Sequence, residues 1–231
     1  ITVSTGEQSL TMKAIFSRCK GASHEVSGKV CQDYCQEEVT DSYTIGVVSD
    51  GHGGDRYFRS DVGSKSAVEA TLDCVREFVQ TADEGLFSGA PLTKCGTVAA
   101  EREKNGSGRG DECYALFRQL FSSIICKWHE RILEDARRPA TSEEREKVPQ
   151  EHIAAFESTD SSGNRTGIEQ TYGCTLMCFV QTKSYWFAFH IGNGKCISFS
   201  ADGGSLSWNE PVPWDEKCFR NVTTSLCDPE A

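Results

Sequence analysis

The stretch VVSDGHGGDRYF, residues 47–58, joins the end of an apolar run to an acid, a histidine and three closely spaced glycines. Asp50 follows Val47 and Val48, so its carboxylate stands at the tip of a strand that the sequence predicts to be buried. Because an unpaired buried carboxylate is costly, Asp50 is either solvated or held ionised by a cation. Glycines let the backbone turn sharply and bring its carbonyls close to a ligand. The stretch favours a metal pocket; a plain glycine-rich turn from strand to helix, with His52 merely exposed, stays open as the alternative.

Two other loop types do not fit this stretch. An EF-hand calcium loop starting at Asp50 would need oxygen ligands where His52 and Gly54 stand, and its required glycine is replaced by Asp55. A phosphate-binding P-loop would need a Gly-Lys-Ser/Thr sequence, and none follows.

The composition indicates a protein that can bury a substantial hydrophobic core. The 231 residues are 38% hydrophobic and 25% charged, which is typical of a soluble globular protein. A formal net charge of −10 argues against binding to nucleic acid, whose phosphates such a surface repels. No apolar run approaches the ~20 residues of a membrane helix, and the first residues lack the pattern of a secretory signal. We therefore expect a cytoplasmic protein that binds neither nucleic acid nor membrane.

The cysteine count is high, but the spacing is not that of a metal or redox motif. Twelve cysteines are scattered along the chain without a CxxC pair, and many lie inside apolar runs. We expect buried, reduced thiols that pack as small hydrophobes, rather than a disulfide framework or a zinc site.

The periodicity predicts two groups of strands separated by two long helices. Strands are expected at 11–18, 43–49, 172–182, 184–191 and 195–200, with a short strand around Leu206 and Trp208. The later strands are too closely spaced for parallel crossovers, so they should form an antiparallel meander. Apolar residues at helical spacings predict helices over 62–79 and 113–133. The segments 81–111 and 137–168 are expected to be loops, and the whole is an α+β layered domain.

Five segments in order carry a resemblance to a known family. The strand followed by DGHGG looks like the metal-binding signature of the type 2C metal-dependent serine/threonine phosphatases. GASHEVSGKVCQDY (21–34), YGCTLMCFV (172–180), HIGNGKCISFS (190–200) and NVTTSLCD (221–228) resemble further segments of that family in the same order. The resemblance implies an αββα sandwich, in which two central antiparallel β-sheets are flanked by helices. It also implies one phosphatase-like domain over residues 1–231, incomplete at the C-terminus.

The resemblance implies a role for each residue of the motif. In the family, two Mg²⁺ or Mn²⁺ ions activate a water that hydrolyses phospho-Ser or phospho-Thr directly. Asp50 matches the acid that bridges both metals, and Gly51 matches the residue that lends a backbone carbonyl. Asp33 matches an acid that holds metal-bound water, and His52 matches the acid that protonates the leaving oxygen. The implied partner is a phosphoprotein substrate.

The first motif departs from the family pattern at two positions. Gly28 stands near the place of the arginine that many relatives use to bind the substrate phosphate, which leaves Lys29 or Arg56 as candidates for that role. Gln32 stands where many members carry glutamate; the outer-shell charge is lost, although an amide can still orient water.

The later segments depart further. Asn193 replaces an aspartate that serves an additional metal site in some members. The late acidic motifs are absent before Ala231, and Asp202-Gly203, the only other Asp-Gly pair, is predicted to be a hairpin turn. Since affinity follows ligand number and charge, a tightly held metal pair is not expected.

Three functional hypotheses stay open at this point. The chain is the N-terminal portion of a phosphoprotein phosphatase, weak or inactive as it stands. Alternatively, it is a non-catalytic binding or regulatory module with a phosphatase-like fold, or a metal-dependent hydrolase of small phosphate esters. No feature of the sequence specifies an oligomeric state.

Overall fold

The computed structural model describes residues 2–5, 13–87, 92–93, 109–202, 205–219, 222–229 and 231. Its main feature is a six-stranded sheet in which every neighbouring pair is antiparallel. In spatial order the strands are β2 (Tyr34–Val39), β3 (Tyr43–Ser49), β5 (Leu176–Thr182), β6 (Tyr185–Ile191), β1 (Thr2–Thr5) and β4 (Leu92–Thr93). The strands predicted at 43–49 and 184–191 are confirmed, as is most of the one predicted at 172–182.

A threonine closes each of the two tight hairpins of this sheet. Thr40 Oγ1 accepts a hydrogen bond from the Tyr43 backbone N–H (3.0 Å), and Thr182 Oγ1 accepts one from the Tyr185 N–H (3.0 Å). A side-chain oxygen that bonds a nearby backbone N–H stabilises a sharp reversal of the chain. These turns set the register of β2 with β3 and of β5 with β6.

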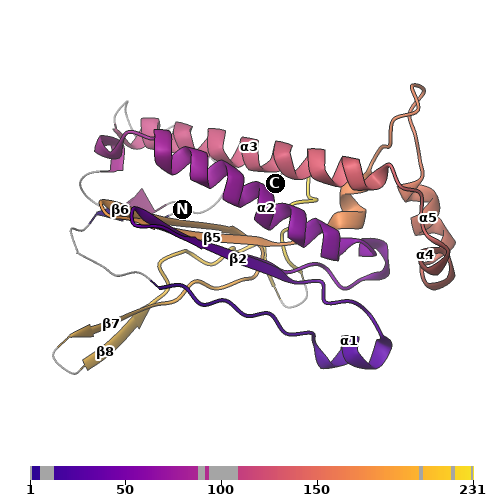
Figure 1. The fold of residues 1–231 in the computed structure, drawn as a ribbon, viewed down its shortest axis with the longest axis horizontal. Coiled ribbons are helices and arrows are strands. Elements are labelled where there is room, and N and C mark those ends of the chain that lie inside the picture. Colours follow the sequence, from indigo (N-terminus) through magenta and orange to yellow (C-terminus); the bar gives the residue numbers. More distant parts are fainter. Residues whose placement is uncertain are drawn as a thin grey trace.

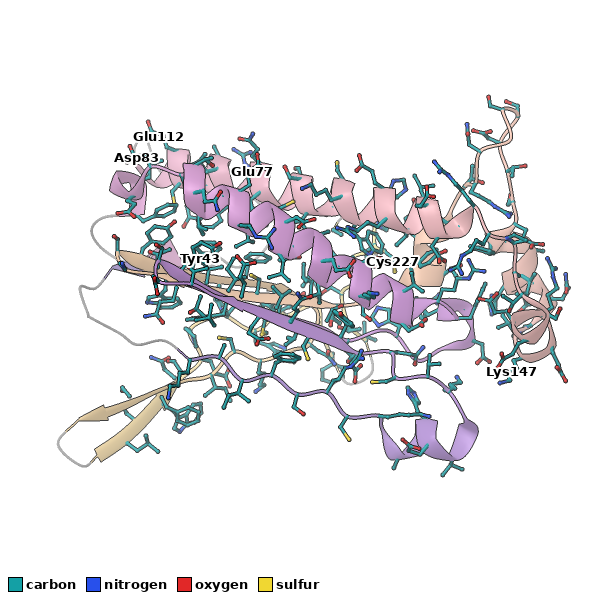
Figure 2. All side chains as sticks on the ribbon, viewed as in Figure 1. Tyr43, Glu77, Asp83, Glu112, Lys147 and Cys227 are labelled. Carbon is teal, nitrogen blue, oxygen red and sulfur yellow. The ribbon has the colours of Figure 1, made fainter. Side chains whose placement is uncertain are left out.

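Helices α2 (Ser60–Thr81) and α3 (Arg109–Ala136) lie side by side across one face of the sheet (Figure 1). Both match the helices predicted over 62–79 and 113–133. Figure 2 shows the layer of side chains that fills the space between the helices and the sheet. The fully buried members of this core include Ile45, Val47, Val68, Val75, Phe117, Ile124, Trp128, Val180 and Phe187.

Close backbone contact fixes the N-terminal half of α2. The Trp128 indole of α3 donates a hydrogen bond to the Gly63 carbonyl (3.1 Å). A Cβ atom on Gly63 would lie 2.0 Å from the Tyr172 carbonyl oxygen, so no larger residue fits there. Tyr172 belongs to the 3₁₀ turn η4 (Ile168–Tyr172), which leads into β5. Helix α2 is thereby held against the segment that precedes β5.

Short helices and 3₁₀ turns form part of the remaining described chain. They are α1 (Ala22–Ser27), α4 (Ser142–Lys147) and α5 (Gln150–Phe156), with 3₁₀ turns η1 (Asp55–Tyr57) and η2 (Glu84–Phe87). The prediction of a loop over 137–168 is therefore wrong, because it contains α4 and α5. Thr141 and Glu144 form a reciprocal capping box that starts α4. Of the predicted loop 81–111, residues 88–91 and 94–108 lie outside the described residues.

The strand predicted at 11–18 is not formed over its described part. Residues 13–18 are irregular, and Ile15 is 98% exposed; residues 11 and 12 lie outside the described ranges. Figure 1 shows the segment leading to α1 on the side of the sheet opposite α2 and α3.

Strands β7 (Ser198–Asp202) and β8 (Ser205–Asn209) form a separate two-stranded hairpin. The predicted meander therefore ends at β6, although the antiparallel pairing of β7 with β8 is confirmed. Asp202 pairs with Ser205 at the tip, where Gly203 lies outside the described residues. Paired Phe199 and Trp208 are mostly exposed. The described residues thus form an α+β fold with one large sheet and a hairpin; they do not form a second large sheet.

The eleven described cysteines are free thiols, and most of them are buried as predicted. The buried members are Cys35, Cys74, Cys113, Cys174, Cys178, Cys218 and Cys227, the last of which is labelled in Figure 2. Cys19 and Cys126 are exposed. Cys95 lies outside the described residues.

Candidate metal and phosphate site

Asp50 follows the end of β3, and Thr175, the residue before β5, holds its backbone through both its N–H and its carbonyl. The Thr175 N–H donates to the Asp50 carbonyl (2.8 Å), and the Asp50 N–H donates to Thr175 Oγ1 (3.0 Å). Ser49 Oγ in turn donates to the Thr175 carbonyl (2.6 Å). These bonds hold the backbone of Asp50 in place between the end of β3 and the start of β5.

Asp33 is close enough to Asp50 to act on the pKa of its carboxyl. Although solvent reaches Asp50, burial together with the charge and the hydrogen bond of Asp33 raises the pKa of its carboxyl to about 6. Nearby His24 acts in the opposite direction. Two carboxylates this close repel each other when both are ionised, and a cation relieves that repulsion. The structure thus brings together the two acids that the sequence assigned to one site.

Gly51 is buried, and its lack of a side chain is required for packing. A Cβ atom there would lie 2.5 Å from the Gln32 carbonyl oxygen and 2.8 Å from the Ser60 carbonyl oxygen. Gly51 also forms an isolated bridge with Cys174. None of the described glycines of DGHGG has a positive φ angle. Gly51 is therefore needed because three backbone segments approach one another closely there, and not because the chain makes a glycine-driven sharp turn as expected.

His52 is half-buried and stands two residues after Asp50 in the sequence. Its backbone N–H donates to the Gly173 carbonyl (3.0 Å), and its ring packs edge-on against Tyr57 with centroids 4.7 Å apart. Burial lowers the pKa of His52, while Asp228 raises it and Arg56 lowers it further. Burial thus favours the neutral imidazole over the charged form. A phosphate dianion beside the ring would favour the protonated form.

The two candidate phosphate-binding cations flank the same loop and already have partners. Lys29 Nζ donates to the Gly53 carbonyl (3.1 Å) and lies 3.5 Å from an Asp55 carboxylate oxygen. Arg56 is exposed; it stacks on the Tyr57 ring at 4.5 Å and donates to its hydroxyl. Both side chains can reach solvent beside the loop.

Two residues that depart from the family pattern lie at or next to a glycine with a positive φ angle. Gly28 adopts a left-handed conformation (φ 68°) that ends α1, a position where glycine is preferred. Asn193 is exposed after β6, next to Gly192, whose φ of 112° is strained for other residues.

The segment that contains Thr224, Ser225 and Leu226 contacts the site through Cys174, just before β5. The Leu226 N–H and Ser225 Oγ both donate to the Cys174 carbonyl (2.9 and 3.0 Å). The Gly192 N–H donates to Thr224 Oγ1 (2.9 Å). The segments that resemble the family motifs are therefore neighbours in space around Asp50.

Two observations limit what the described residues can hold. No group of three or more His, Cys, Asp or Glu side chains within the described ranges is placed to bind a metal ion. None of the helices in these ranges combines the length and the apolar character needed to cross a membrane.

Sequence reasoning did not predict the contacts of three residues that build the site. Thr175 fixes Asp50, and Gln32 and Ser60 contact each other and the His52 carbonyl. Thr175 lies in the YGCT segment that carried the resemblance, and this was the only signal for it. Gln32 was noticed as a departure from the pattern, but Ser60 carried no signal.

The fold and the arrangement of motifs define a class of phosphatase-like domains, and comparison with known proteins agrees. The family model described as protein phosphatase 2C matches residues 20–231. The chain therefore belongs to the type 2C protein phosphatase family. No curated protein and no solved structure matches it.

Proposed function

We propose that this chain acts as a metal-dependent phosphoprotein phosphatase on phospho-Ser and phospho-Thr. The observation that carries the proposal is the proximity of Asp33 to Asp50, which follows the end of β3 and stands two residues before His52. Family membership supports the reaction class. A cytoplasmic location belongs to the same proposal.

The donor atoms at this site suit a hard divalent cation. Asp50 and Asp33 offer carboxylate oxygens, which Mg²⁺ and Mn²⁺ prefer, and burial first, then the neighbouring Asp33, raises the pKa of Asp50. The described residues add no third side chain of a metal-binding group. They fit one weakly held cation and do not by themselves fit a pair.

Each residue then has a role that its position supports. A bound Mg²⁺ or Mn²⁺ would supply neutralisation of the phosphate charge and activation of water. Asp50 and the Gly51 carbonyl would hold the cation directly, and Asp33 would hold it through water. His52 would donate its Nε2 or Nδ1 proton to the leaving serine or threonine oxygen. Lys29 and Arg56 would bind the phosphate from the solvent side.

The αββα sandwich and the single-domain organisation over residues 1–231 belong to this proposal as well. The exposed apolar side chains of Val48, Phe199 and Trp208 support a second β layer on the side of the main sheet opposite α2 and α3.

The alternative is a non-catalytic module that binds phosphoproteins. The absence of a third acidic ligand from the described residues favours it, because a weakly held cation gives slow hydrolysis.

The deciding experiment measures phosphate release from an aryl phosphate and from a panel of phospho-Ser and phospho-Thr peptides, with and without Mn²⁺. We expect Mn²⁺-dependent release that Asp50→Ala lowers by about a hundredfold, the scale on which one transition-state contact acts. Asp41→Ala, in the exposed turn between β2 and β3, is the matched control. Binding of phosphopeptide without any turnover would select the binding module, and turnover of the aryl phosphate alone would select small esters.

A further inference from the structure

Gln32 connects the loop 50–54 to the start of α2. Its side chain is buried, and its amide Nε2 donates to the His52 carbonyl (3.0 Å) and to Ser60 Oγ (2.6 Å). Ser60 Oγ also donates to the His52 carbonyl (2.9 Å). The three groups form a closed triangle in which one carbonyl oxygen receives two donors.

The chemistry of this triangle requires an amide at position 32. The His52 carbonyl can only accept, so the atom of Gln32 that faces it must be the nitrogen. An ionised glutamate would place an acceptor against an acceptor in a buried setting, which is unfavourable. Glutamine in this chain is therefore matched to Ser60 and to the His52 carbonyl.

The triangle fixes one side of the His52 backbone, and Gly173, between η4 and β5, fixes the other. The His52 N–H donates to the Gly173 carbonyl (3.0 Å), while its C=O is held by Gln32 and Ser60. In a planar trans peptide the carbonyl points opposite to the N–H, so the Gly51 carbonyl points away from Gly173. Holding the His52 backbone thus also sets the direction of the Gly51 carbonyl and the position of the Cα atom from which the imidazole extends.

We propose that Gln32 is a positioning residue for the loop 50–54. Its amide holds the His52 backbone so that the Gly51 carbonyl and the His52 imidazole keep fixed directions. Gln32 itself does not touch substrate. The effect on cation and substrate rests on the proposed function, whereas the hold on the loop is a property of the metal-free chain.

The first test uses the metal-free protein and measures hydrogen exchange of the His52 amide by NMR. Gln32→Met keeps the shape and removes the donor, and Gln32→Glu replaces it with an acceptor. Thr71→Val, which removes a buried hydroxyl that bonds within α2, is the control for a general loss of stability. We expect about tenfold faster exchange at His52 in both Gln32 variants after correction for global stability, and no change in the control. Unchanged exchange, or equal acceleration in Thr71→Val, overturns the proposal.

The second test measures the affinity for Mn²⁺ by titration. Gln32→Met should weaken binding by about tenfold, as loss of an outer-shell partner does, while Thr71→Val should not. Ser60→Ala removes one of the two donors, so it should show a smaller change in both tests; it also serves if the Gln32 variants do not fold. Equal Mn²⁺ affinity in wild type and Gln32→Met overturns the role in the site. If wild type binds no Mn²⁺, the proposed function fails, and exchange at His52 still decides the hold on the loop.

Discussion

Arg59 and Glu144 face each other through two parallel hydrogen bonds, from Nε to Oε1 (2.7 Å) and from Nη2 to Oε2 (3.0 Å). Arg59 is only 4% exposed; its Nη1 also donates to Asp135 Oδ2 (2.9 Å), and its guanidinium stacks over the Phe156 ring at 4.5 Å. This one side chain ties the start of α2 to the end of α3 and to α4. It lies directly after the loop that carries the candidate site.

Removing the charge of Arg59 should strongly destabilise the fold. In Arg59→Met, the two carboxylates lose their cation in a partly buried place, which costs about 3–5 kcal/mol of unfolding free energy. Urea denaturation measures the change. Arg137→Met removes an exposed pair with Glu134 and should cost less than about 0.5 kcal/mol. Equal losses in the two variants would contradict the structural role of Arg59.

The same pair gives the fold a defined response to acid. Burial raises the pKa of Glu144, but hydrogen bonds from Arg59 and from the Thr141 N–H outweigh it, so the folded pKa lies below 4.5. A lowered pKa contributes stability that is fully present above about pH 4.5 and is lost as the pH falls through the folded pKa. Denaturation between pH 6 and pH 3 should therefore show a smaller pH-dependent loss in Glu144→Gln than in wild type. A parallel pH dependence would contradict this pKa direction.

Gly51→Ala should disturb the site more than Gly53→Ala. The new methyl group at position 51 would lie within 3 Å of two backbone carbonyl oxygens, and backbone cannot move aside cheaply. We expect a loss of about 1–3 kcal/mol, together with weaker Mn²⁺ binding. At Gly53 the nearest atom lies 3.8 Å away, so Ala fits there. Chemical denaturation and Mn²⁺ titration of both variants provide the comparison, and equal effects would refute the close approach at Gly51.

Thr175→Val tests how Asp50 is held. Valine keeps the shape of threonine but leaves the Asp50 N–H without its acceptor. We expect a loss of about 1 kcal/mol, and a weaker affinity for Mn²⁺ because the carboxylate is less fixed. Thr71→Val loses a comparable buried hydrogen bond and should keep the affinity of wild type. The idea fails if the affinity of Thr175→Val is also unchanged.

The hydrophobic pattern was enough to predict the core elements. Strands β3 and β6 and helices α2 and α3 bury long apolar faces, and their periodicity is visible in the sequence. The segment 11–18 has a strand-like composition, but a strand also needs a partner, and Ile15 lies exposed over the described part. The capping box of Thr141 and Glu144 is a sequence signal for helix α4. It was overlooked because the segment is polar.

The candidate site was predictable only in part. Asp50, Gly51 and His52 are contiguous, and the family resemblance added Asp33, which the structure places beside Asp50. The partners that fix them come from distant positions. Gln32 meets Ser60, and Asp50 meets Thr175, through contacts that arise only when the sheet and α2 come together. No local pattern encodes such contacts.

The burial of the thiols gives the protein a built-in reporter of its own unfolding. Maleimide dyes react with thiolates, and burial raises the pKa of Cys174 to about 12 and that of Cys178 further still. Cys19 and Cys126 lie at the surface, so they should label first. Counting the dye molecules attached per chain, as denaturant is added, would then follow the opening of the sheet without any engineered probe.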